Sequence, residues 1–136
     1  MAARGQVGIG VIGCGGRIRK VLGNLPGMGR SLNVVGLVDP AEHSINAARD
    51  EFNPKAEVYQ TAQEMVSAKD VDWVVIGSWN CFHKEHAVAA LRAGKHVFCE
   101  KPLATSLKDC LAIRKAHRAS GKLFCIGFTL RYTPLY

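Results

Sequence analysis

QVGIGVIGCGGRIRKVLGNL, residues 6–25, is the stretch that decides the fold. The apolar run Gln6–Ile12 predicts a strand that is buried on both faces, as central strands of parallel sheets are. The turn Gly13-Cys14-Gly15-Gly16 follows, where glycine lets the backbone adopt positive φ and approach a ligand closely. Apolar residues then recur at helical spacing over Arg17–Leu25, and Pro26 ends that helix. Strand, glycine turn and helix together predict the first unit of an α/β fold.

The rest of the chain repeats this unit of strand and helix. Further strands are predicted at 32–38, 58–59, 71–76, 96–99 and 122–128, and further helices at 41–52, 61–67, 81–93 and 105–120. On the last helix, we expect the apolar side that faces the sheet to consist of Leu107, Cys110, Leu111 and Ala116. Alternating strands and helices imply right-handed crossovers. The prediction is a doubly wound parallel sheet, the Rossmann fold, with strand order 3-2-1-4-5-6 and helices on both faces.

The pattern GxGxxG matches in two registers near the first strand. The more regular match uses Gly8, Gly10 and Gly13, but it lies inside the strand, where no turn is wanted. The turn between strand and helix is Gly13-x-Gly15, with Ile18 at the third glycine position. The first two glycines still permit a tight turn with a pyrophosphate on the amide groups of the following helix. The departure at Ile18 affects only close packing of the helix.

Asp39 follows the second strand, 26 positions after Gly13. An acid near this spacing accepts hydrogen bonds from an adenosine ribose, which favours NAD over NADP. The alternative is that Asp39 only caps the next helix and that the glycine turn holds no ligand. Three cations, Arg17, Arg19 and Lys20, could cover an adenine face or meet the 2′-phosphate of NADP, or they could simply be solvated.

Composition excludes several classes of protein. With 136 residues, 48% of them hydrophobic, the chain can bury one sizeable core. No stretch approaches the ~18 unbroken apolar residues of a membrane span, and residues 1–6 lack the order of a signal peptide. Five cysteines without a CxxC pair predict reduced thiols. We therefore expect a soluble, cytoplasmic protein without a membrane partner.

The net charge of +7 admits an anionic partner. The basic residues are scattered over several predicted helices, however, and no basic and aromatic platform accompanies them. We therefore expect no nucleic-acid partner.

In order along the chain, four segments resemble the glucose-fructose oxidoreductase and inositol dehydrogenase family (Gfo/Idh/MocA). They are Gly13-Cys14-Gly15, Asp39, Ser78-Trp79-Asn80-Cys81-Phe82-His83 and Ala93-Gly94-Lys95-His96-Val97-Phe98-Cys99-Glu100-Lys101-Pro102-Leu103-Ala104. The last is the most specific, and the similarity extends over the whole chain. The resemblance implies the N-terminal domain of an oxidoreductase that uses NAD, or alternatively NADP, on sugars, polyols or related hydroxyl compounds.

The resemblance also implies site residues. Lys101 would lie beside the nicotinamide and the substrate hydroxyl, where an ammonium can stabilise a developing alkoxide and assist proton transfer. Glu100 would orient Lys101 or the nicotinamide ribose. Trp79 stands where the family usually has proline. Together, the candidate cofactor-binding residues are Gly13, Cys14, Gly15, Gly16, Arg17, Ile18, Asp39, Ser78, Trp79, Asn80, His83, Glu100, Lys101 and Arg131.

A metal site is not expected. His83-Lys84-Glu85 matches the H-x-E of zinc deaminases, but the later P-C-x-x-C of that signature is missing. His83 and His86 lack carboxylate or cysteine partners at ligand spacing.

The resemblance divides the chain into residues 1–128, the dinucleotide-binding domain, and 129–136, the start of a connection to a substrate domain that is absent. We therefore expect this chain to bind cofactor with little turnover, the hydroxyl substrate being held by the absent domain. The alternative is a sensor or interaction module that binds a dinucleotide without chemistry. Self-association is expected from an exposed apolar end that comprises Phe124, Phe128, Tyr132, Leu135 and Tyr136.

Overall fold

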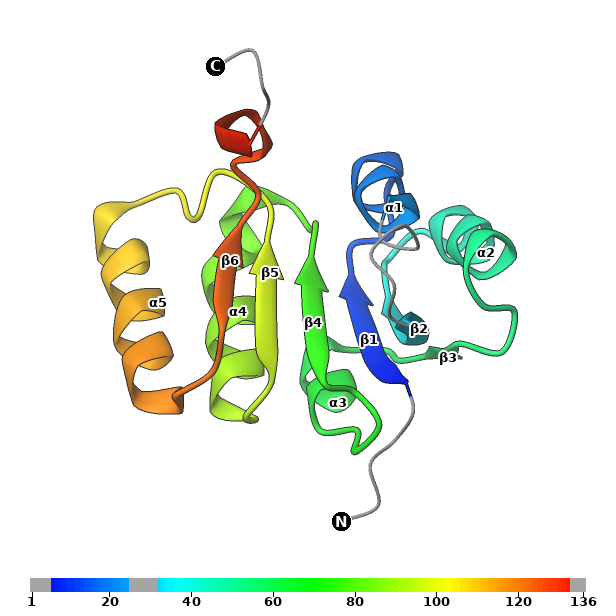
Figure 1. Cartoon of the computed structure of the whole chain (residues 1–136), viewed down its shortest axis with the longest axis horizontal. Coiled ribbons are helices and arrows are strands. Elements are labelled where there is room, and N and C mark those ends of the chain that lie inside the picture. The colour runs from blue at the N-terminus through cyan, green and yellow to red at the C-terminus, as the bar shows by residue number, and fades with distance from the viewer. Residues whose placement is uncertain (1–5, 25–31, 133–136) are drawn as a thin grey trace.

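Six parallel strands form one sheet in the order β3-β2-β1-β4-β5-β6 (Figure 1). The computed structural model describes residues 6–24 and 32–132. The strands are β1 Val7–Ile12, β2 Leu32–Val38, β3 Glu57–Val58, β4 Trp73–Ile76, β5 His96–Cys99 and β6 Phe124–Ile126. This confirms the predicted doubly wound sheet and its strand order. The last strand is shorter than expected.

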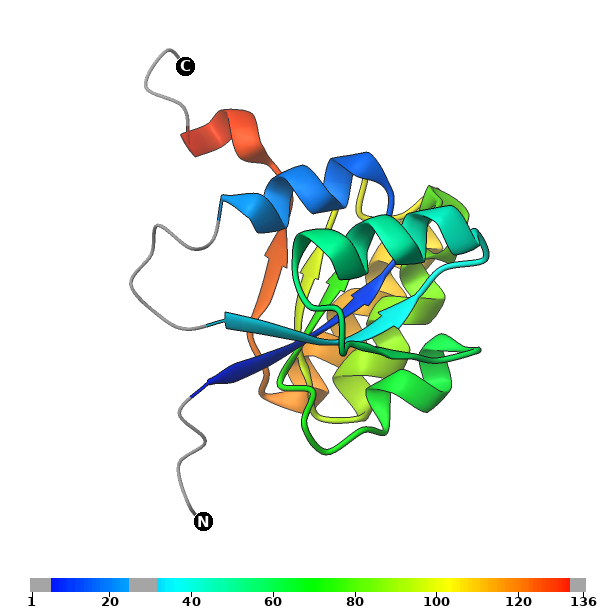
Figure 2. The ribbon, with the colours of Figure 1, turned by 90° about the vertical axis from the view of Figure 1, so that its right-hand side faces the viewer.

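Helices cover both faces of the sheet, as predicted. The α-helices are α1 Gly16–Gly23, α2 Glu42–Glu51, α3 Ala62–Val66, α4 His83–Arg92 and α5 Leu107–Ser120, and the 3₁₀ turns are η2 Asn80–Phe82 and η3 Thr129–Tyr132. Figure 2 shows the sheet nearly edge-on, with α1 and α2 on one face and the other α-helices on the opposite face. The helix expected at 81–93 thus begins with a 3₁₀ turn. The predicted end of the first helix at Leu25–Gly27 lies outside the described residues.

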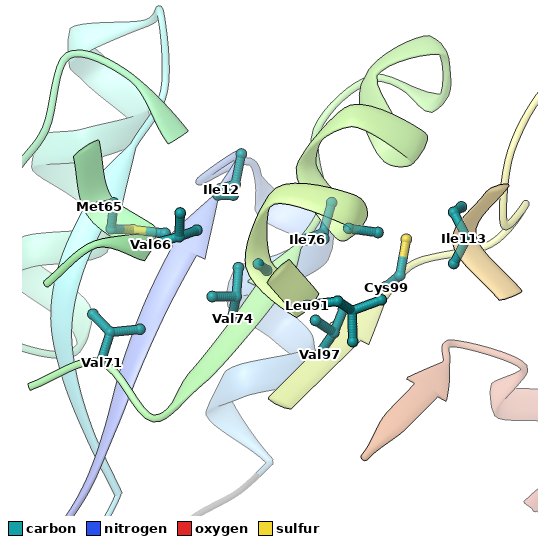
Figure 3. Close-up of a cluster of buried hydrophobic side chains, with 12 residues drawn as sticks. Ile12, Met65, Val66, Val71, Val74, Ile76, Leu91, Val97, Cys99 and Ile113 are labelled. Atoms are coloured by element: carbon teal, nitrogen blue, oxygen red, sulfur yellow. The ribbon is translucent and has the colours of Figure 1, made fainter. Parts of the chain in front are cut away.

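Two apolar cores lie on the two faces, because successive residues of a strand point to opposite sides. Ile12 belongs to the core under α3, α4 and α5, which Figure 3 shows. Its neighbour Val11 belongs to the core under α1 and α2. Both are at most 2% exposed. Burial on both faces explains why β1 is an almost unbroken apolar run.

The predicted inward face of α5 is wrong for two of its leucines. Leu107 is 76% exposed and Leu111 is 43% exposed, whereas Ile113, which was not predicted, is 2% exposed. The reason is the place of α5 at the edge of the sheet, where it packs on α4 and on only a narrow strip of strand. A helix in this position needs a narrower apolar stripe than one over the centre of the sheet.

The apolar C-terminal end differs from expectation at Phe124. This residue is half-buried under α5, with its ring centroid 5.8 Å from that of His117, whereas Phe128 is 50% exposed. The side chain of Tyr132 and residues Leu135 and Tyr136 lie outside the described part. Within residues 6–24 and 32–132, no helix combines the length and the apolar character that crossing a membrane requires.

Candidate functional site

The carboxyl ends of the strands meet at one edge of the sheet, where β1 and β4 lie side by side. From β1 the chain crosses towards β2, and from β4 it crosses towards β5. The loops after these two strands therefore diverge, and in open α/β sheets such a reversal opens the ligand crevice.

Gly13 begins the turn after β1 with φ +83°, a conformation that favours glycine. A Cβ at Gly13 would lie 2.4 Å from the backbone nitrogen of Ser78, so the loops after β1 and β4 touch backbone to backbone. Gly15 differs: its φ is −64°, and a Cβ there would meet nothing within 4 Å. The turn is therefore fixed at Gly13 and open at Gly15, next to the first amide groups of α1.

Ile18 at the third glycine position is accommodated by a glycine on another strand. Ile18 is 1% exposed, and its Cγ1 lies 1.9 Å from where a Cβ of Gly77 would stand. The close packing of α1 on the sheet thus comes from Gly77, directly after β4. Sequence reasoning missed Gly77, although its place between an apolar strand and the polar turn at 78–80 was a signal for it.

Asp39 links the glycine turn to the start of α2. Its Oδ2 accepts a hydrogen bond from the amide of Cys14 at 2.6 Å, and its Oδ1 accepts one from the amide of Ala41 at 2.8 Å. Each oxygen retains a lone pair for a further donor. The Cys14 thiol is fully buried, and burial raises its pKa to about 12, so this thiol is neutral and not nucleophilic.

The cations near the turn are mostly paired. Arg17 Nε donates to Glu100 Oε1 at 3.1 Å, and Arg19 Nη1 donates to Glu51 Oε2 at 3.3 Å, while Lys20 is exposed. The guanidinium of Arg17 therefore reaches towards β5, on the opposite side of β1 from Asp39.

Glu100 and Lys101 follow β5 and point to different surroundings. Glu100 is 6% exposed, and besides Arg17 it accepts a hydrogen bond from the amide of Lys101 at 3.3 Å. Lys101 is exposed, and its peptide bond to Pro102 is cis. The side-chain partner of Glu100 is Arg17, and a role of Glu100 in orienting Lys101 or a ribose stays a prediction.

His83, one of the predicted cofactor-binding residues, is fully buried. Its Nδ1 lies 2.8 Å from the carbonyl oxygen of Pro102, and its Nε2 lies 3.0 Å from that of Ser78. One imidazole ring thus joins the loop after β4 to the loop after β5. A ring with a hydrogen on each nitrogen would donate to both carbonyls, and a neutral ring to one.

The loop after β4 presents Ser78, Trp79 and Asn80 at the edge of the sheet. Ser78 Oγ lies 2.9 Å from Nδ1 of His86. Burial of the His86 ring lowers its pKa. Trp79 is 80% exposed, and its φ of −61° is the angle that a proline ring fixes. The backbone at Trp79 is therefore one that a proline would also adopt.

Among the remaining candidates, Gly16 opens α1 and is exposed, and Arg131 is exposed on η3, which follows β6. Contacts between the loops thus bring together, at the carboxyl edge of the sheet, the glycine turn, the loop after β4 and the Glu100–Pro102 loop. Such an arrangement offers helix amide groups for an anion, a carboxylate for hydroxyl groups and an exposed ammonium.

Comparison with known proteins agrees with this geometry. Residues 7–128 match the model of an oxidoreductase family described as having an NAD-binding Rossmann fold. The chain is 42% identical, over 135 residues, to an inositol 2-dehydrogenase of Gluconacetobacter diazotrophicus. The aligned region covers 96% of this chain and 39% of that relative. It is 37% identical over 138 residues to one from Agrobacterium fabrum, with 96% and 39% covered.

A solved structure of Lactobacillus casei myo-inositol dehydrogenase, in complex with NAD(H) and myo-inositol, superposes with a TM-score of 0.85 at 30% identity. The match covers 94% of this chain and 38% of that one. The chain therefore spans about two fifths of the length of the relatives it matches. It belongs to the Gfo/Idh/MocA oxidoreductase family and contains that family's NAD-binding Rossmann domain.

Proposed function

We propose that this chain is the nucleotide-binding half of an NAD-dependent oxidoreductase that transfers a hydride between the nicotinamide and a cyclic polyol or a related sugar. The observation that carries the proposal is the arrangement of the crevice. The glycine turn, Asp39 and the exposed Lys101 meet at one edge of the sheet. The relatives named inositol 2-dehydrogenase support the substrate class.

The residues present fit a dinucleotide. The open space at Gly15 lets a diphosphate approach the amide groups at the start of α1, where the helix dipole favours an anion. Asp39 would use its remaining lone pairs to accept hydrogen bonds from ribose hydroxyl groups. Arg17 would stay on the β5 side through Glu100, so we do not propose it as the partner of a 2′-phosphate.

Lys101 is the proposed catalytic residue. The bound cofactor would supply the hydride acceptor. The ammonium of Lys101 would donate a hydrogen bond to the substrate oxygen, stabilise the alkoxide that develops there and assist the movement of its proton. Glu100 and His83 would hold the loop that carries Lys101, one through Arg17 and the other through the carbonyl of Pro102.

For the domain organisation, we propose that residues 1–128 are the nucleotide-binding domain and that 129–136 begin the connection to a substrate domain. The end of the family match at residue 128 supports this boundary. Five free cysteines support a reducing, cytoplasmic environment. Exposed Phe128 and Leu130 support burial of this end against another domain or a second copy.

Titration calorimetry of this chain with NAD and NADP, run in parallel, tests the binding function. We expect saturable heat with NAD and at least tenfold weaker affinity for NADP, a difference of about 1.4 kcal/mol. Absence of heat with both cofactors would refute the proposal. A tenfold preference for NADP would overturn the role of Asp39.

The catalytic role needs the complete enzyme. There, Lys101→Ala should lower kcat by at least a hundredfold while changing the Kd for NAD by less than threefold. Equal losses in both quantities would make Lys101 a binding residue. Binding of NAD without any oxidation of inositols or sugars by the complete protein would favour a sensor module.

A further inference from the structure

A groove of about 560 Å³ runs between α4 and α5, and none of its lining residues belongs to the candidate site. Its floor is apolar and is formed by Val88, Leu91, Ala112, Ala116 and Ala119. The three alanines leave the groove open on the side of α5, because larger side chains at these positions would fill the space. We call this feature the α4/α5 groove.

The rim of the α4/α5 groove is basic. Lys84, Arg92 and Lys115 line it, and no carboxylate among the described residues does. The wider region has the same sign: residues 83–120 hold eight Lys and Arg against three Asp and Glu, which gives +5 of the net +7 of the chain. Two of those three acids are already engaged, Glu100 with Arg17 and Asp109 with Ser106. The two helices that form the groove, α4 and α5, account for +4 of this charge.

We propose that the α4/α5 groove binds an acidic amphipathic helix of a partner protein. An apolar floor between two parallel helices suits the apolar stripe of a third helix, whose residues at i, i+3, i+4 and i+7 would enter the groove. The cations of the rim would then lie beside acidic residues that flank the stripe. Such charge complementarity raises the association rate and selects the partner more than it adds affinity.

Other occupants fit the groove less well. A nucleic acid is recognised by cations with aromatic or polar groups that contact bases, whereas the floor here is aliphatic. For a second copy of the chain to occupy the groove, it would need an exposed helix with an apolar stripe and acidic residues beside it. The acidic helix α2 has its apolar residues Ile45 and Ala48 buried against its own sheet. Hence α2 offers no apolar stripe to a second groove.

The test uses a fluorescent synthetic helix of 16 residues with a leucine stripe flanked by glutamates, titrated with the 136-residue chain in an anisotropy assay. We expect saturable binding that weakens at least tenfold between 50 and 300 mM salt. The double variant Lys84→Glu, Lys115→Glu should bind this peptide at least tenfold more weakly. The same variant should bind a second peptide, in which lysines replace the glutamates, more tightly than it binds the first. Ala119→Trp, at an exposed floor position, should also weaken it at least tenfold by filling the groove.

The matched control is Lys55→Glu combined with Lys69→Glu, which makes the same charge change at exposed sites outside the groove. This pair should change the affinity for the peptide by less than threefold. Each variant should retain the helical circular dichroism of the parent and its affinity for NAD, which separates loss of the groove from loss of the fold.

Several outcomes would overturn the proposal. They are no saturable binding up to millimolar chain, equal weakening by the control pair, or no effect of Ala119→Trp. Tighter binding of duplex DNA than of the peptide, abolished by the Lys84 and Lys115 reversals, would assign the groove to nucleic acid instead. Dimerisation in sedimentation that Ala119→Trp abolishes would assign it to a second copy.

Discussion

The two loops that flank the crevice are held in place by different means. The turn after β1 is fixed mainly by close packing against the backbone that follows β4, with Gly13 against Ser78 and the Ile18 side chain against Gly77, and the Asp39 carboxylate accepts from the Cys14 amide. The Glu100–Pro102 loop is fixed by side chains that come from other elements, Arg17 and His83. The difference matches the proposed roles, because a diphosphate is bound by backbone amides whereas chemistry requires an exposed side chain.

The largest expected effect lies at Gly77, which tests the backbone-held turn. Gly77→Ala places a Cβ 1.9 Å from Ile18 Cγ1, and overpacking of this kind costs ~1–3 kcal/mol or more. We expect urea unfolding to show a loss of about 3 kcal/mol. The control is Gly15→Ala, whose Cβ meets nothing within 4 Å, so it should cost less than about 0.5 kcal/mol.

The same pair of variants separates folding from binding. Gly15→Ala should still weaken the affinity for NAD at least tenfold, since its methyl group would occupy the space left for the diphosphate. Unchanged affinity in Gly15→Ala would contradict the place given to the diphosphate.

A smaller effect is expected at His83, which tests the loop held by side chains. His83→Ala removes both imidazole contacts, leaves the carbonyls of Ser78 and Pro102 without this partner and opens a cavity where the buried ring lay, at a cost of about 2 kcal/mol in the free energy of unfolding. His86→Ala, on the same helix but only half-buried, should cost less than half as much. If the two variants were equally stable, His83 would not be the link between the loops.

The ion pair at the crevice should contribute less. Glu100→Gln keeps the shape of a buried side chain but removes its charge opposite Arg17, and we expect a loss of about 1 kcal/mol. Glu51→Gln removes the more exposed pair with Arg19 and should cost less than about 0.5 kcal/mol. Glu100→Gln should also weaken NAD binding. A larger loss in Glu51→Gln would reverse the ranking of the two pairs.

The smallest effect concerns pH. Burial lowers the pKa of His86 and also that of His96, where Lys122 adds to the shift. The unfolded chain therefore binds more protons near pH 6, and the free energy of unfolding should fall as pH drops below ~6.5. Urea titrations at pH 7.5, 6.5 and 5.5 measure this slope. His86→Gln combined with His96→Gln should flatten it, and an unchanged slope would exclude these groups as its cause.

The contrast between the loops also explains what could be predicted from the sequence. The glycine turn follows from a local signal, an apolar run that ends in glycine. Strand order follows from the alternation of strands and helices along the chain and the regular topology of doubly wound sheets. The partner of Arg17 lies 83 positions away and that of Ile18 lies 59 away, so no local pattern specifies them. The buried position of His83 and the exposure of Leu107 depend likewise on where helices end relative to the sheet.

Nuclear magnetic resonance of the ¹⁵N-labelled chain during titration with NAD tests the central claim most directly, that both loops face one dinucleotide. We predict amide shift changes at residues 13–18 and 78–80 and at Asp39, Ala41, Glu100 and Lys101, while residues 112–120 of α5 stay unchanged. Changes that omit either the glycine turn or the Glu100–Pro102 loop, or that centre on α5, would contradict the account.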